Sequence, residues 1–138
     1  MKILIVDASA AASWLLASQA TRPALDLLDR LDAWRLAAPY VFDWEIGNLL
    51  VRQARRDPGF DLADALARLD EFEIEAAPAP DRNSINRLAR LGAAKRLSLF
   101  DISYLYLALG LDGALASRDG SLLAAARAAG VDVFDLRD

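Results

Sequence analysis

Residues 2–6 read KILIV, a short apolar run in which three of the five side chains are β-branched. A continuous apolar run of this length is typical of a strand buried on both faces of a parallel sheet. Residues 9–18, SAAASWLLAS, follow it with helical character. The chain therefore opens with a strand and then a helix, which together begin a parallel α/β fold.

The same alternation continues to the end of the chain. Further strands are expected at 35–38, 73–76, 113–117 and 131–136, and helices at 22–31, 41–56, 61–72, 98–110, 120–129 and from Asp81 past Leu91. This order predicts a three-layer α/β/α fold with a mainly parallel central sheet of about five strands. No linker, repeat or low-complexity tail interrupts residues 1–138, so a single domain is expected.

The composition excludes several kinds of chemistry. The 138 residues are 55% hydrophobic and include no cysteine and no histidine. Disulfides, thiolate sites, serine–histidine triads and imidazole catalysis are therefore impossible. The apolar run near the N-terminus is too short for a signal peptide, and no segment approaches the roughly 20 apolar residues of a membrane span. We expect a soluble cytoplasmic protein with no membrane contact.

Four acids stand where a parallel sheet places its ligands, beyond the carboxyl ends of the strands. Asp7 directly follows the first strand, and Asp119 lies two residues after the strand that ends near Ser117. Asp101 begins an otherwise apolar helix, and Glu45 lies one turn into the long helix at 41–56. The four come from distant parts of the chain and can meet at one rim.

Each of these acids also has an ordinary interpretation. An Asp between a strand and a helix is often only an N-cap, which applies to Asp7 and Asp119. For Asp101, helix capping and a functional role are both open. Glu45 fits a solvated helix face, and the nearby Asp43 is an equally exposed candidate.

Taken together, four segments resemble the PIN domain family, and more narrowly the VapC ribonuclease toxins of bacterial VapBC toxin–antitoxin pairs. The first two are IVDASA at 5–10 and WEIGNLL at 44–50. The others are LSLFDISYLYLAL at 97–109 and ALASRDGSLLAAARAAGV at 114–131. The resemblance covers essentially the whole chain in the family's order. Ser117 departs from it slightly, because threonine is commoner at that position.

The resemblance implies a site and an activity. Asp7, Glu45, Asp101 and Asp119 match the family's catalytic, metal-binding acids, while Ser9, Asn48 and Ser117 match supporting polar positions. All-oxygen ligands favour a hard cation, so Mg²⁺ or Mn²⁺ is expected. The implied reaction is endoribonuclease cleavage of RNA that leaves a 5′-phosphate and a 3′-hydroxyl.

The resemblance also implies partners. A toxin of this type pairs with a cognate VapB-like antitoxin, and the apolar helices suggest a homodimer. Fourteen of the sixteen basic residues are arginine. Among them, Arg52, Arg55, Arg56 and Arg118 are candidates for holding RNA phosphates, although a solvated surface position explains each equally simply.

Other interpretations of the sequence stay open. A phosphatase of the haloacid dehalogenase kind also begins with an apolar strand and an Asp, but it has a second Asp where this chain has Ser9. A response-regulator receiver needs a pair of acids at the first strand end, which is missing here. A PIN-like binding or scaffold module without nuclease activity is the third alternative.

Overall fold

The computed structural model describes residues 1–138 and contains one five-stranded sheet. Its strands are β1 (Lys2–Val6), β2 (Trp34–Ala38), β3 (Glu75–Ala76), β4 (Ala114–Ser117) and β5 (Val133–Asp135). They lie in the order β3-β2-β1-β4-β5, and every neighbouring pair is parallel. The expected fold class, a three-layer α/β/α arrangement around a parallel sheet, is confirmed.

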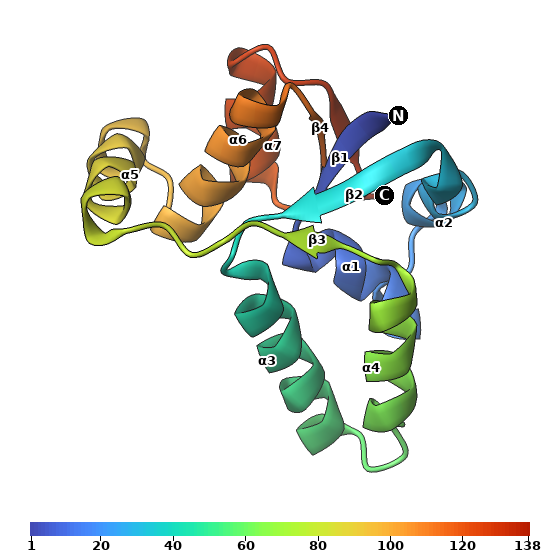
Figure 1. Cartoon of the computed structure of the whole chain (residues 1–138). Coiled ribbons are helices and arrows are strands. Elements are labelled where there is room, and N and C mark those ends of the chain that lie inside the picture. The colour runs from blue at the N-terminus through green and yellow to red at the C-terminus, as the bar shows by residue number, and fades with distance from the viewer.

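Seven helices connect and cover these strands (Figure 1). They are α1 (Ala8–Leu15), α2 (Arg22–Leu28), α3 (Phe42–Arg56), α4 (Leu62–Glu71), α5 (Arg82–Lys95), α6 (Leu99–Leu111) and α7 (Gly120–Ala128). Helix α1 packs with α2, α3 and α4, whereas α6 packs with α5 and α7 and also contacts β1 and β4. None of the helices combines the length and the apolar character that crossing a bilayer requires.

The direction in which the chain adds strands to the sheet changes between β1 and β4. The chain runs outward from β1 through β2 to β3, then returns to the other side of β1 and continues through β4 to β5. Right-handed crossovers then require the first helices and the later helices to cover opposite faces of the sheet. Ligands of open parallel sheets bind in the crevice at such a switch point.

The core follows from the apolar runs in the sequence. Leu4, Ile5 and Val6 of β1 are fully buried, and the first and last of them pair with alanines of β4, Leu4 with Ala114 and Val6 with Ala116. Alanine at these positions leaves room for the bulky side chains of α6, among which Tyr104 is almost completely buried. The central strand is thereby fixed between the two helical layers.

Several element ends differ from the expected ones. The first helix ends at Leu15 instead of residue 18, and a separate 3-10 turn follows at Ala17–Gln19. The second ends at Leu28, and the strand expected at 73–76 is only Glu75–Ala76. Helix ends fray easily, so sequence patterns locate helices better than they locate their last turns.

A close turn joins α5 to α6 and places the start of α6 near the sheet. The C-cap of helix α5 is Arg96, which has a left-handed backbone with φ of 58°. Gly92 makes this possible, because a Cβ there would lie only 2.8 Å from the carbonyl oxygen of Leu97. A larger residue would separate the two helices and shift Asp101.

Candidate active site

The four predicted acids line one pocket of about 580 Å³ at the switch point between β1 and β4. Asp7 follows β1, Asp119 follows β4, Glu45 lies in the first turn of α3, and Asp101 lies in the first turn of α6. Ser9 and Asn48 also line this pocket, which we call the acidic cleft. Asp43 does not line it, so the structure separates Glu45 from its neighbour in the sequence.

Asp7 is held rigidly at the floor of the acidic cleft. Its side chain is only 6% exposed, and both carboxylate oxygens accept hydrogen bonds. Oδ1 accepts from the Ser9 hydroxyl at 2.7 Å and from the backbone N–H of Ala10 at 2.8 Å, and Oδ2 accepts from the Ser117 hydroxyl at 2.5 Å. Asp7 is therefore both the N-cap of α1 and a side chain fixed by donors from α1 and from the end of β4.

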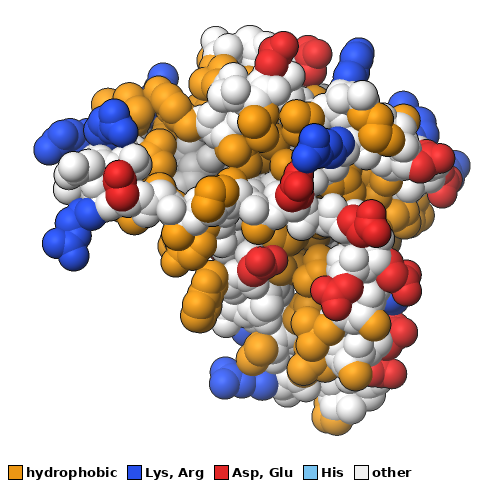
Figure 2. All heavy atoms as spheres, viewed as in Figure 1, with side chains coloured by type: hydrophobic (Ala, Val, Ile, Leu, Met, Phe, Trp, Pro, Cys, Tyr) orange, Lys and Arg blue, Asp and Glu red, His pale blue; other side chains and the backbone are white.

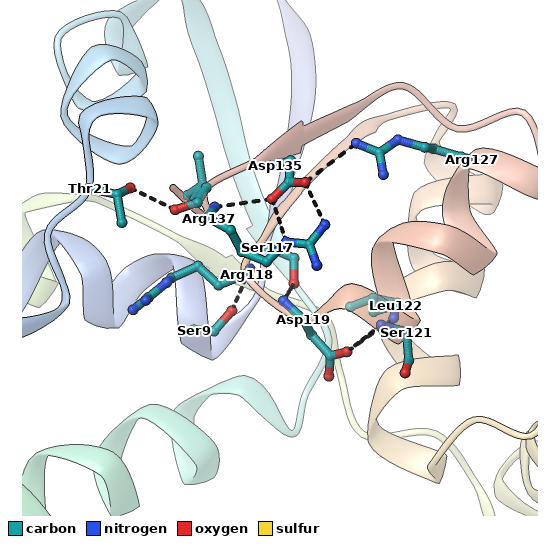
Figure 3. Close-up of polar contacts among 11 residues, drawn as sticks. Ser9, Thr21, Ser117, Arg118, Asp119, Ser121, Leu122, Arg127, Asp135 and Arg137 are labelled. Carbon is teal, nitrogen blue, oxygen red and sulfur yellow. Dashed lines mark hydrogen bonds and ion pairs between the residues drawn. The ribbon is translucent and has the colours of Figure 1, made fainter.

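The two serines connect the acids to one another. The Ser117 hydroxyl, fully buried, donates to Asp7 and accepts from the backbone N–H of Asp119 at 2.9 Å. The Ser9 hydroxyl likewise accepts from the backbone N–H of Arg118 at 2.9 Å (Figure 3). Each hydroxyl thus donates to Asp7 and accepts from a backbone N–H of the segment after β4. These bonds hold the ends of β1 and β4 together.

Asp119 has one oxygen occupied by the backbone. Its Oδ1 accepts from the N–H groups of Ser121 at 2.9 Å and Leu122 at 3.2 Å, so the side chain caps α7 (Figure 3). No backbone N–H or hydroxyl donates to its Oδ2. The N-cap interpretation is thus correct for Asp7 and Asp119, and for Asp119 it leaves the second oxygen free for a ligand.

Asp101 is not the cap of its helix, so the capping interpretation of this residue is wrong. The N-cap of α6 is Ser98, whose hydroxyl accepts from the backbone N–H of Asp101 at 3.0 Å. The Asp101 carboxylate is thereby released from any capping task. It is half-buried and faces the acidic cleft.

Glu45 has a partner that the sequence did not reveal. The hydroxyl of Tyr104 donates to Oε1 of Glu45 at 2.7 Å. Tyr104 lies one turn after Asp101 in α6, and its ring is buried in the core. The ring of Tyr104 packs in the core, but its hydroxyl belongs to the site. Its position three residues after Asp101 was the available signal.

The electrostatics of the site reflect burial and crowded negative charge. Burial raises the pKa of Asp7 to about 6, although hydrogen bonds from Ser117 and Ser9 oppose the rise. Burial, followed by the charges of Asp119 and Asp7, raises the pKa of Asp101 to about 6. Burial and then the charge of Asp101 also raise the pKa of Glu45, while the Tyr104 hydroxyl lowers it. A bound cation would offset this repulsion.

The carboxylate oxygens of the acidic cleft suit a hard divalent cation, but the acids are not arranged around a position for one. Carboxylate oxygens are the ligands that Mg²⁺ and Mn²⁺ prefer. No group of three or more acidic side chains in the structure is arranged so that it could hold a metal ion. Both oxygens of Asp7 accept hydrogen bonds from hydroxyl and amide donors. The donor types fit a metal, and their side chains would have to turn toward it.

The arginines near the site fall into two groups. Arg118 turns away from the acidic cleft: its Nη1 donates to Gln19 at 3.1 Å, and its buried Nε has no hydrogen-bond partner. Arg52 lines the acidic cleft, whereas Arg55 and Arg56 line an adjoining groove. Of the four arginine candidates, only Arg52 directly borders the acids.

Two exposed aromatic side chains also line the acidic cleft, and neither was among the predicted site residues. Trp44 is 74% exposed in the first turn of α3, and Phe100 is 49% exposed in the first turn of α6. Each is adjacent in sequence to a candidate acid, Glu45 or Asp101. An apolar side chain beside an acid at a helix start was the signal that could have found them.

The comparisons with known proteins agree with this fold. The family model of the PIN domain matches residues 4–128, so the chain belongs to the PIN domain family. PIN domains are commonly nucleases, and PIN nucleases usually use divalent metals. The chain thus has a fold that is generally a nuclease fold.

A solved structure with the same fold supports the assignment. The crystal structure of PAE2754 from Pyrobaculum aerophilum is similar with a TM-score of 0.69 and 24% sequence identity, over 96% of this chain and 90% of that chain. At this identity the similarity concerns the fold. The comparison with curated proteins gave no match.

Proposed function

We propose that this chain is a metal-dependent endoribonuclease that cleaves RNA phosphodiester bonds in the acidic cleft. The observation that carries the proposal is the convergence of four acids from four distant segments at the switch point of the sheet. Crowding carboxylates raises their pKa values and is unfavourable without a cation. A fold that holds them together therefore fits a site for Mg²⁺ or Mn²⁺.

In this proposal Asp7, Asp101 and Asp119 hold the metal, and Glu45 completes the set. The metal, when bound, would supply an activated water and would stabilise charge on the phosphodiester. Glu45 orients the attacking water with Oε2, because Tyr104 occupies Oε1. Ser9 and Ser117 keep Asp7 in place through their hydroxyls. Asn48, exposed one turn after Glu45, contacts the substrate.

Binding of Mn²⁺ tests the site separately from the reaction. Calorimetric titration of Mn²⁺ into the wild-type protein should give saturable binding, and Asp101→Asn should weaken it at least tenfold. Asp112→Asn is the matched control, because Asp112 is exposed at the far end of the same helix. Equal Mn²⁺ affinity in all three proteins would reject Asp101 as a ligand.

We further propose that the chain is the toxin of a type II toxin–antitoxin pair, acting in the cytoplasm as a homodimer. The support is the resemblance of residues 97–109 and 114–131 to VapC toxins, which a neighbouring VapB-like reading frame would strengthen. Induced expression should arrest growth, and Asp101→Asn should relieve the arrest. Normal growth with active nuclease would leave a ribonuclease that is not a toxin.

One observation favours a second candidate function. Because no three acids are arranged to hold a metal, a PIN-like binding module without nuclease activity is the alternative. A binding module would neither bind Mn²⁺ in the acidic cleft nor cleave RNA, whereas the proposed nuclease would do both. The Mn²⁺ titration above separates them.

A further inference from the structure

A second groove opens directly beside the acidic cleft and has the opposite charge. It has a volume of about 400 Å³ and is lined by Leu16, Gln19, Leu49, Arg52, Arg55 and Arg56. We call it the arginine groove. Leu49 and Arg52 line both this groove and the acidic cleft, so the two hollows are continuous along α3.

The sequence of α3 places acid and base on one face of the helix. Glu45, Asn48, Arg52 and Arg55 follow one another at steps of three or four residues, which is the spacing of a single helical face. At 1.5 Å per residue, Arg55 lies about 15 Å along the helix axis from Glu45. Helix α3 therefore extends from the candidate active site to the arginines of the groove.

The three arginines of the groove are exposed and have no acidic partner. The ion pairs of the protein involve Arg35, Arg127 and Arg137, and no carboxylate lies within 4.0 Å of a groove guanidinium. Arg56 donates to the amide of Gln53 at 3.0 Å. The helix dipole also favours cations in the last turn, which accounts in part for Arg55 and Arg56, but not for Arg52.

Basic and acidic side chains lie over different helices on the face that Figure 2 draws. Figure 2 shows basic side chains beside the C-terminal half of α3 and over α5, and acidic side chains over α4. The protein as a whole carries a net charge of −4. An acidic cleft repels a polyanionic strand, so unpaired cations next to it are needed to attract one.

We propose that the arginine groove binds the phosphodiester backbone of the RNA strand on one side of the scissile bond. The proposal rests on the ribonuclease function proposed above. Guanidinium groups read phosphate oxygens through planar pairs of N–H donors. The other walls of the groove, two leucines and one glutamine, carry no charge that would oppose a phosphate. Arg52, at the junction of the two hollows, binds the phosphate nearest the cleft.

The test measures RNA binding in an inactive background, so that it does not depend on cleavage. All proteins carry Asp101→Asn, and fluorescence anisotropy follows labelled RNA of about 16 nucleotides at several salt concentrations. The test variant adds Arg52→Gln and Arg55→Gln. The matched control adds Lys2→Gln and Arg22→Gln, which remove the same charge at exposed positions outside the groove and the cleft.

We expect the groove variant to bind roughly tenfold more weakly at low salt, because it lacks two phosphate contacts. Its slope of log affinity against log salt should also fall by about 1.4. The control should keep the affinity within about twofold of its parent. Circular dichroism and thermal melting confirm that each variant is folded.

Equal affinity and equal salt slope in the groove variant and the control would overturn the proposal. If the protein without substitutions cleaves RNA with metal in that case, the ribonuclease function stands and only the groove assignment fails. If the inactive parent binds no RNA at any salt concentration, the groove assignment fails together with the proposed function.

Discussion

The hydroxyl of Ser117 donates to Oδ2 of Asp7 at 2.5 Å across a separation of 110 residues, and it is fully buried. The hydroxyl oxygen of Ser117 also accepts from the backbone N–H of Asp119. One small side chain at the end of β4 thus holds the ends of the two strands at the switch point. The geometry of the candidate site depends on this contact more than on any ion pair.

Removing the Ser117 hydroxyl should destabilise the protein. Ser117→Ala leaves a buried carboxylate oxygen and the N–H of Asp119 without their partner, so the free energy of unfolding should fall by about 1–3 kcal/mol. Urea denaturation measures it. The control is Ser103→Ala, which removes a hydroxyl bonded to a carbonyl within α6 and should change stability by less than about 0.5 kcal/mol. Equal losses would contradict the special position of Ser117.

Neutralising Asp7 should abolish nuclease activity without a large loss of stability. In EDTA at neutral pH, Asp7→Asn removes a buried charge that the fold disfavours, and Asn still caps a helix well. The variant should be about as stable as the wild-type protein, because losing the buried charge offsets losing the oxygen that accepts from the Ser117 hydroxyl, and it should have no nuclease activity. Thermal melting and RNA cleavage measure the two effects. A large loss of stability would show that the charge of Asp7 is needed for folding.

Tyr104→Phe should impair catalysis and leave substrate binding unchanged. The hydroxyl fixes Oε1 of Glu45, and a hydrogen bond to a charged group contributes about 1.5–3 kcal/mol. If Glu45 orients the attacking water, kcat should fall roughly tenfold to a hundredfold with little change in KM. Tyr106→Phe is the control, since the Tyr106 hydroxyl has no hydrogen-bond partner in the structure. Steady-state kinetics measure kcat and KM of both variants. An equal kcat in the two variants would contradict the role of the Tyr104 hydroxyl.

Stability in EDTA should fall as the pH rises. Burial raises the pKa of Asp7 and of Asp101 from 3.8 to about 6, so the folded state binds more protons than the unfolded state between these values. The resulting stabilisation is complete below about pH 4 and is lost as the pH passes about 6. Glu45 acts in the same direction. Differential scanning calorimetry should therefore give a lower melting temperature near pH 7.5 than near pH 5.

The Asp7→Asn variant provides the internal check, because its pH dependence in this window should be weaker. Mn²⁺ should raise the melting temperature more near pH 7.5 than near pH 5, since a bound metal needs the ionised carboxylates. A wild-type melting temperature that rises from about pH 5 to about pH 7.5 in EDTA would contradict the raised pKa values.

The fold was predictable because its signals are local. Apolar runs such as residues 2–6 mark their own strand. Helix caps such as Thr21, Asp61 and Asp81 mark their own helix, and each of these side chains accepts a hydrogen bond from a backbone N–H of its first turn. The end of α1 was not predictable in this way. Residues 16–18 continue the helical pattern, and tertiary packing decides where the helix stops.

The candidate site was predictable only in part. Ser98 stands three residues before Asp101, the spacing of a helix cap, so the sequence did contain the signal that Asp101 is not a cap. The contact between Tyr104 and Glu45 spans 59 residues and depends on how α6 lies against α3, which no local pattern encodes. Likewise, the boundary between the acidic cleft and the arginine groove follows from the packing around α3.

Cleavage of RNA by the purified protein tests the central claim most directly. The protein, its Asp101→Asn variant and its Asp112→Asn variant are each incubated with RNA in Mg²⁺ or Mn²⁺ and again with EDTA. We expect the wild-type protein and Asp112→Asn to cleave RNA only when Mg²⁺ or Mn²⁺ is present and to leave 5′-phosphate ends. We expect no cleavage by Asp101→Asn. Cleavage that persists in EDTA, or that survives Asp101→Asn unchanged, would contradict it.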